Sequence, residues 1–297
     1  METFINGVVH FEIEHFAVGG FYILVVVLLA VGGQVIVKKF MGAETIELCH
    51  EVGGYYMSIV GAMYAVILGL VIFDAISNFQ AASLAVKDEA KALLAVYSLA
   101  DQFPGNGKEE VKSMTQTYVK EVAENEWGLM DQNAFSLKAR ASMWSILDRV
   151  KKIEPRSDNQ RVILPILINE TLLAWSARRE RIEKIGIGIP NLEWFTLLAG
   201  AVVTIVFTYF FTIAIGTLQL LMTAMVAFMV AINLYLVLTF GNPYSGDLRI
   251  PSTAFNVLNQ YMNSHLSFLD GAEKSGAEES ISKAPDWVIR HSPAISD

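Results

Sequence analysis

The side chains that could do acid–base or metal chemistry in this chain do not form a catalytic motif. The sequence has no glycine-rich phosphate loop, no nucleophile elbow and no cysteine–histidine metal spacing. His10, Glu12, Glu14 and His15 are close in sequence, but at these spacings on a helix their side chains do not converge on one ion. The pattern favours a solvated or interfacial polar face. We therefore expect no catalytic residue, no metal site, no cofactor and no enzymatic activity.

Polar residues within long apolar stretches are a stronger indication of function, because such residues are costly in lipid and usually face a partner or a water-filled path. Asp74 and Glu193 lie at the ends of apolar stretches, so they either reach headgroup water or line a pore. Asn233 lies deeper, and it either hydrogen-bonds a neighbouring helix or lines a cavity. These three are the pore-lining candidates. Gln34 lies close enough to the interface to need no special role.

Four apolar stretches position these residues, and each is near the ~20 residues that a helix needs to span ~30 Å of hydrocarbon. They are Phe16–Val37, Gly53–Phe73, Leu192–Ile213 and Leu218–Phe240. The long segment between the second and third stretches is polar, with helical periodicity and no strand-like alternation. The sequence therefore predicts an all-α integral membrane protein. Four transmembrane helices carry a helical extramembrane domain inserted between the second and third spans.

The predicted organisation has four parts. Residues 1–77 form the N-terminal segment and the first two spans, and residues 78–190 form the extramembrane domain. Residues 191–240 form a transmembrane hairpin, and residues 241–297 form a C-terminal segment that we expect to be mobile beyond about residue 271 because it is poor in apolar residues.

Helical periodicity also predicts the elements of the polar segment. The second span has no breaker after it, so one helix is expected from about Gly53 to Leu99, before Pro104-Gly105. The further predicted helices are Lys108–Trp127, Ala134–Val150, Asn159–Lys184 (kinked or beginning near Pro165) and Ser252–Leu269.

Small residues recur every four positions in the second span, at Gly61, Ala65 and Gly69. Such a stripe lets helix backbones approach closely, which is how membrane helices commonly pack. We interpret it as a helix–helix seam, and a pore wall is the alternative.

A second cluster is basic. Arg178, Arg179 and Arg181 come shortly before the third span, where they either anchor the protein on lipid headgroups or pair with carboxylates through their planar guanidinium groups. The acidic residues best placed in sequence are Asp88 and Glu89, on the helix that follows the second span.

Composition limits the partners and the compartment. The 297-residue chain is 53% hydrophobic and has a formal net charge of −8, which points to a lipid bilayer and not to nucleic acid. The lone cysteine, Cys49, excludes an intrachain disulfide. The positive-inside rule gives two answers, because the basic residues on the domain side outnumber Lys38 and Lys39, whereas the first span alone favours the reverse orientation. The larger count favours a cytoplasmic domain in the inner membrane.

The chain resembles the bestrophin-like family of bacterial membrane proteins. The matching stretches run in the same order from about Gly53 to Phe255. They are Gly61 to Gly69, Val86 to Ala90, Glu126-Trp127, Arg178 to Arg181, Ile189 to Trp194, Gly200 with Thr208 to Phe211, Leu220 to Ala224, and Pro243 to Gly246. No acidic cluster like the calcium clasp of bestrophins and no run of three phenylalanines in the second span is present.

This resemblance implies a homo-oligomeric, channel-like protein that conducts small anions, with four spans per subunit, a cytoplasmic helical domain and a pore lined by the second span. The alternative is a membrane-anchored sensory or scaffolding module whose spans only tether it. A pore needs small or polar residues that face a common axis, and a tether does not; Asn233 and the glycine stripe favour the pore.

Overall fold

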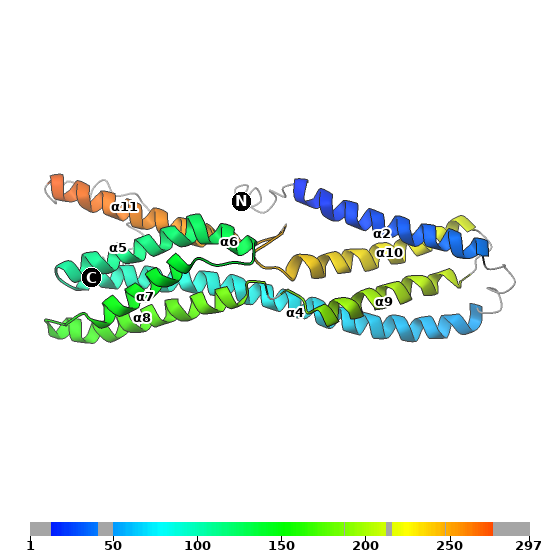
Figure 1. The fold of residues 1–297 in the computed structure, drawn as a ribbon, viewed down its shortest axis with the longest axis horizontal. Coiled ribbons are helices and arrows are strands. Elements are labelled where there is room, and N and C mark those ends of the chain that lie inside the picture. The colour runs from blue at the N-terminus through cyan, green and yellow to red at the C-terminus, as the bar shows by residue number, and fades with distance from the viewer. Residues whose placement is uncertain (1–12, 41–49, 187, 212–215, 247, 276–297) are drawn as a thin grey trace, which may run out of the picture. The chain divides into compact units, whose positions relative to one another are not determined.

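Helices are the only regular secondary structure in the part of the chain that the computed structural model describes, residues 13–40, 50–186, 188–211, 216–246 and 248–275. Figure 1 shows the order of the elements. The α-helices are α2 (Ile13–Phe40), α4 (His50–Leu99), α5 (Asn106–Glu121), α6 (Trp127–Asp131), α7 (Leu137–Lys151), α8 (Asp158–Glu183), α9 (Asn191–Tyr209), α10 (Gly216–Phe240) and α11 (Thr253–Ser275). A 3₁₀ turn, η1 (Ala100–Gln102), follows α4, and a π-helical turn, η2 (Val122–Glu126), separates α5 from α6.

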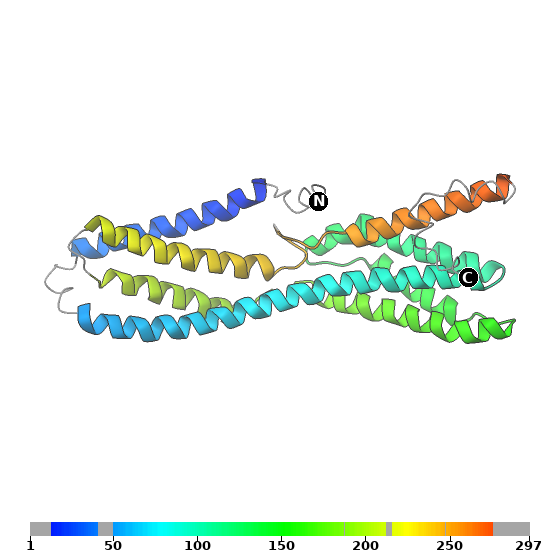
Figure 2. The ribbon, with the colours of Figure 1, turned by 180° about the vertical axis from the view of Figure 1, so that it is seen from behind.

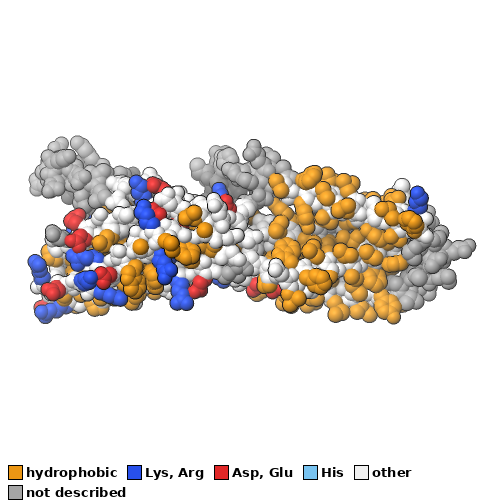
Figure 3. Space-filling view, in the orientation of Figure 1, with side chains coloured by type: hydrophobic (Ala, Val, Ile, Leu, Met, Phe, Trp, Pro, Cys, Tyr) orange, Lys and Arg blue, Asp and Glu red, His pale blue; other side chains and the backbone are white. Residues whose placement is uncertain are grey.

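Four of these helices are long and apolar enough to cross a membrane, as the sequence predicts. They are α2 from Val18, α4 from Gly54, the whole of α9 and the whole of α10. The apolar side chains that a soluble protein would bury are exposed over these helices (Figure 3). Because exposed apolar surface of this extent is stable only in lipid, the arrangement is that of a multi-pass membrane protein.

Helix α4 is a single element of 50 residues. Its course is uninterrupted in Figure 2. Between Gly69 and Pro104 the sequence has neither glycine nor proline, so nothing in it breaks the hydrogen-bond ladder. The chain turns only at Pro104-Gly105, where Gly105 adopts a φ of 71° that favours glycine. The continuous helix expected from the sequence is therefore present.

Other helix boundaries differ from the predicted ones for local reasons. The predicted helix Lys108–Trp127 is divided by the π-turn η2. Helix α7 begins at Leu137, later than predicted, because the Ser136 hydroxyl caps it by accepting a hydrogen bond from the Ala139 amide at 3.1 Å. Helix α8 begins at Asp158 and passes through Pro165. The last helix, α11, continues past the predicted end at Leu269.

The chain forms two compact units, each with its own core. Unit 1 comprises residues 1–85, 130–134 and 179–250, and contains the membrane helices. Within it α2 packs along α10, and α9 contacts both. Its core cluster consists of Tyr64, Leu68, Leu197, Ala201, Val230, Leu234 and Val237. Gly200 permits the close approach of α4 and α9, because a Cβ atom there would collide with the Tyr64 ring.

Unit 2 comprises residues 86–129, 135–178 and 251–297. Its apolar core includes Leu93, Val96, Val111, Met143, Ile146, Val150, Leu167, Phe255 and Met262, all of them essentially inaccessible to solvent. Charged side chains gather on the outer surface of α5, α7 and α8 (Figure 3), which is typical of helices that face water.

Candidate functional site

The first half of α4 has two different faces. One face inserts Tyr64 and Leu68 into the core against α9 and α10. Gly61 is half-buried, Ala65 and Gly69 are exposed, and a Cβ atom added at either glycine would meet nothing within 4 Å. The small-residue stripe is therefore left uncovered by the described residues of its own chain. Whatever packs on it, lipid or another copy, comes from outside the subunit.

The three polar candidates of the spans take different positions. Asp74 and Glu193 line one small cavity of about 130 Å³ together with Asn78 and Lys184. The Asn78 amide donates to the Asp74 carboxylate at 2.9 Å, and the Lys184 ammonium donates to the Asn78 side-chain oxygen at 2.8 Å. This cavity has two carboxylates and one ammonium, so its formal charge favours small cations over anions.

Asn233 is not part of that cavity. Its amide donates to the backbone oxygen of Met229, four residues earlier on the same helix, at 2.7 Å. This bond lies within α10 itself, so it differs from both roles expected from the sequence, a bond to a neighbouring helix and the lining of a cavity.

The arginine cluster divides into one exposed and two buried side chains. Arg179 is exposed and pairs with Glu183, four residues later, at 2.8 Å. Arg181 is fully buried, and its guanidinium lies 2.9 Å from the Met130 sulfur. Arg178 is buried within unit 2. Of the three, only Arg179 has the exposure that a headgroup anchor requires.

Arg178 is the centre of a buried polar network. Its two terminal nitrogens each lie 2.7 Å from an oxygen of Glu126, which is the bidentate geometry that makes arginine–carboxylate pairs strong. Its Nη1 also donates to the Tyr118 hydroxyl at 2.8 Å, and that hydroxyl donates to Glu89. Arg178 is thus joined to Glu89 through Tyr118, while Asp88, the other expected partner, is exposed.

The π-turn explains how this network acquires its second carboxylate. In a regular helix Glu121 and Glu126 would point in directions about 140° apart, since each residue turns the helix by about 100°. The turn η2 inserts the extra residue of an i→i+5 ladder, and both side chains are buried. The network members Tyr118, Glu121 and Glu126 were not among the residues predicted from the sequence. The spacing of apolar residues between positions 106 and 131 fits a continuous helix and does not indicate the π-turn.

Glu121 forms a neighbouring set of contacts. It accepts hydrogen bonds from Lys138 at 2.8 Å, from the Ser136 hydroxyl at 2.9 Å and from Asn125 at 2.9 Å. The hydrogen bond from Lys138 is the main reason that the pKa of Glu121 is lowered, and it outweighs the opposing effect of burial.

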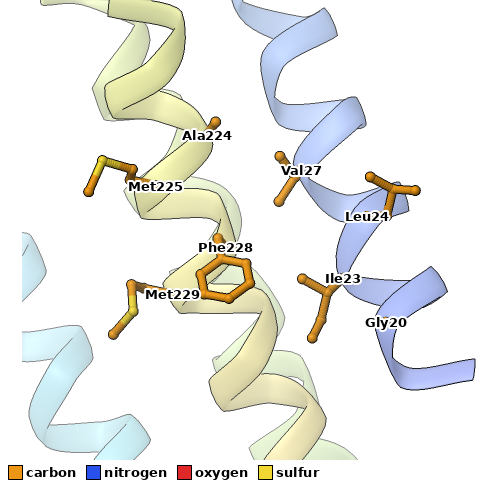
Figure 4. Close-up of a pocket in the computed structure, with 8 residues that line it drawn as sticks. All are labelled: Gly20, Ile23, Leu24, Val27, Ala224, Met225, Phe228 and Met229. Atoms are coloured by element: carbon orange, nitrogen blue, oxygen red, sulfur yellow. The ribbon is translucent and has the colours of Figure 1, made fainter. Parts of the chain in front are cut away.

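A wide apolar groove runs between α2 and α10. It has a volume of about 660 Å³ and is shown in Figure 4 with its lining residues Gly20, Ile23, Leu24, Val27, Ala224, Met225, Phe228 and Met229. None of these side chains carries a hydrogen-bonding group apart from the weakly accepting methionine sulfurs, so the groove suits hydrocarbon.

His10 and Glu12 lie outside the described residues. The residues that are described contain no cluster of histidine, cysteine or carboxylate side chains suited to a metal ion.

The fold and the exposed apolar spans define a four-span helical membrane protein with an inserted helical domain. The chain belongs to the bestrophin-like family, because the model of the bestrophin-like domain matches residues 24–255. No curated protein matches the sequence.

Solved structures show the same fold. One is the crystal structure of a mutant of a bacterial bestrophin homologue from Klebsiella pneumoniae, with a TM-score of 0.62 and 12% identity over 82% of this chain and 98% of that one. Two more are proline-to-alanine variants described as a membrane protein. They have TM-scores of 0.61 and 0.60, each at 12% identity over 82% of this chain, covering 97% and 98% of their own.

Proposed function

We propose that the protein is a homo-oligomeric membrane channel that conducts small anions along an axis lined by α4. The observation that carries the proposal is the uncovered small-residue face of α4, at Gly61, Ala65 and Gly69, in a chain of the bestrophin-like family. Uncovered glycines in a span are suited to close packing against another copy or to lining a narrow path. A tether would need neither.

The packing of the single chain supports a path between subunits. Leu197, Leu234 and Val237 fill the middle of the described bundle and are almost completely buried. Because close-packed apolar side chains exclude hydrated ions, the described helices of one subunit offer no continuous route across the membrane. An ion path would have to form where copies of α4 meet.

The test is a flux and symmetry experiment on the full-length protein. Detergent-purified protein should form one oligomer with an axial opening, and in liposomes it should release chloride but not gluconate. The reversal potential in a potassium chloride gradient then identifies the ion. A potential at the potassium value would refute anion selectivity. It would instead fit the acidic cavity at Asp74 and Glu193, whose formal charge favours cations. A monomer without flux would favour the tether.

We also infer that the inserted domain faces the cytoplasm of the inner membrane. The basic residues near the membrane on that side, among them Lys87, Lys91 and Lys184, support this orientation. Lys39→Cys and Lys152→Cys in a Cys49→Ser background form a matched pair for labelling with a membrane-impermeant thiol reagent. In spheroplasts, only the first should react before permeabilisation; the opposite pattern would reverse the orientation.

A further inference from the structure

The buried core of the membrane bundle becomes polar at one end. On α10 every buried position from Ala227 to Val237 is apolar. Toward the start of the helix the buried positions are Gln219 and Thr223. Helix α2 contributes Gln34 near its own end, and this side chain is completely buried. Amide and hydroxyl groups have therefore replaced hydrocarbon in one layer of the core.

Antiparallel packing brings the two glutamines to the same level. Gly19 of α2 lies against the ring of Tyr235 on α10. Gln34 comes fifteen residues after Gly19, and Gln219 comes sixteen residues before Tyr235. Since both helices rise about 1.5 Å per residue, the two side chains lie at about the same height. Figures 1 and 2 agree in placing the end of α2 beside the start of α10.

Helix α9 adds to this layer. The Tyr209 hydroxyl donates to the backbone oxygen of Ala30, one turn before Gln34, at 2.8 Å. The Thr208 hydroxyl lies 3.2 Å from that of Thr223. One turn deeper is Thr204, whose side chain is also buried. We call Gln34, Thr204, Tyr209, Gln219 and Thr223 the glutamine recess.

Several atoms of the recess have no hydrogen-bond partner among the described residues. They are both the oxygen and the nitrogen of the Gln34 amide, the side-chain oxygen of Gln219 and the hydroxyl of Thr204. The Gln219 nitrogen, in contrast, donates to the backbone oxygen of Phe211. Leaving buried donors and acceptors unpaired in a membrane is costly, so such groups are normally satisfied by a bound species.

We propose that the glutamine recess is a binding site for ordered water inside each subunit. The unpaired set contains both acceptors and a donor and carries no charge. A cation would leave the Gln34 N–H groups unpaired, and an anion would leave the two amide oxygens unpaired. Water donates and accepts, so it satisfies all of them. Because the buried positions of α10 are apolar from Ala227 to Val237, the polar layer does not continue through the bundle, and its role is independent of any conduction along α4.

Cysteine reactivity tests this proposal on the full-length protein, and replacing Cys49 by serine removes the only native thiol. The probe is 2-aminoethyl methanethiosulfonate. Gln34→Cys and Gln219→Cys should react about tenfold faster or more than the buried controls Ala227→Cys and Ala231→Cys, because a thiolate forms readily only where water solvates it. Equal, slow reaction at all four positions would overturn the proposal.

A second measurement needs no cysteine and covers the case in which those variants fail to fold. X-ray radiolysis of water generates hydroxyl radicals in place, so bound water in the recess should oxidise Tyr209 in the unaltered protein. In the Gln34→Leu/Gln219→Leu variant, which removes the unpaired amides, oxidation of Tyr209 should fall several-fold. Absence of Tyr209 oxidation in the unaltered protein, or an equal yield in the double variant, would show that the recess is dry.

Discussion

At the scale of single residues, the pair formed by Arg178 and Glu126 is the most consequential contact in unit 2. Both side chains are buried, so removing one partner leaves an uncompensated charge. We expect Arg178→Met to lower the free energy of unfolding by about 3–5 kcal/mol, and Arg178→Met/Glu126→Met to recover much of that loss. Thermal unfolding in detergent measures both.

The matched control for this pair is Arg179→Met, one residue away in an exposed pair with Glu183. Surface pairs contribute about 0–1 kcal/mol, so this variant should unfold close to the parent. If Arg178→Met and Arg179→Met unfolded at the same temperature, the network would not contribute to stability as its geometry indicates.

The pH dependence of unit 2 should include a contribution from Glu121. The hydrogen bond from Lys138 is the chief reason that the pKa of this carboxyl in the folded protein is lowered from its ordinary value. The folded state therefore binds a proton there less readily than the unfolded state does. The resulting stabilisation is complete above the unfolded pKa and is lost as the pH falls through the folded pKa.

Unfolding measured from neutral to acid pH checks this contribution. Glu121→Gln should be less stable at neutral pH and should lose less stability on acidification. Glu124→Gln, in the same turn but exposed, should follow the parent curve. Parallel curves for the parent and Glu121→Gln would contradict the assignment.

At the scale of elements, the continuity of α4 is open to a direct test at Leu84, an exposed position of this helix. Leu84→Pro removes one ladder hydrogen bond and introduces a clash, so we expect a destabilisation of about 3 kcal/mol or more. Leu84→Ala keeps the ladder and should have a small effect. Equal unfolding temperatures for the two variants would mean that α4 is not a continuous helix at this position.

At the scale of the whole molecule, the stripe of α4 decides whether copies assemble. Gly61→Leu and Gly69→Leu place a large side chain where backbones are expected to approach, and we predict loss of the oligomer in size-exclusion chromatography with light scattering. Gly32→Leu is the control, because it is also a span glycine with nothing within 4 Å.

The three possible results separate the roles of the stripe. Loss of assembly identifies a seam between subunits. Retained assembly with reduced chloride flux identifies a pore wall. Variants that assemble and conduct like Gly32→Leu would show that the stripe faces lipid, and the proposed axis along α4 would be wrong.

The sequence by itself determined the spans, the all-helical inserted domain and the unbroken course of α4, because these depend on apolar length, helical period and the absence of breakers along one chain. Only the tertiary structure decided which polar residues meet. Arg178 reaches Glu126 because a π-turn rotates that residue inward, and Gln34 is buried because α2 packs against α10 and α9. Such contacts join residues far apart in sequence, and no local pattern specifies them.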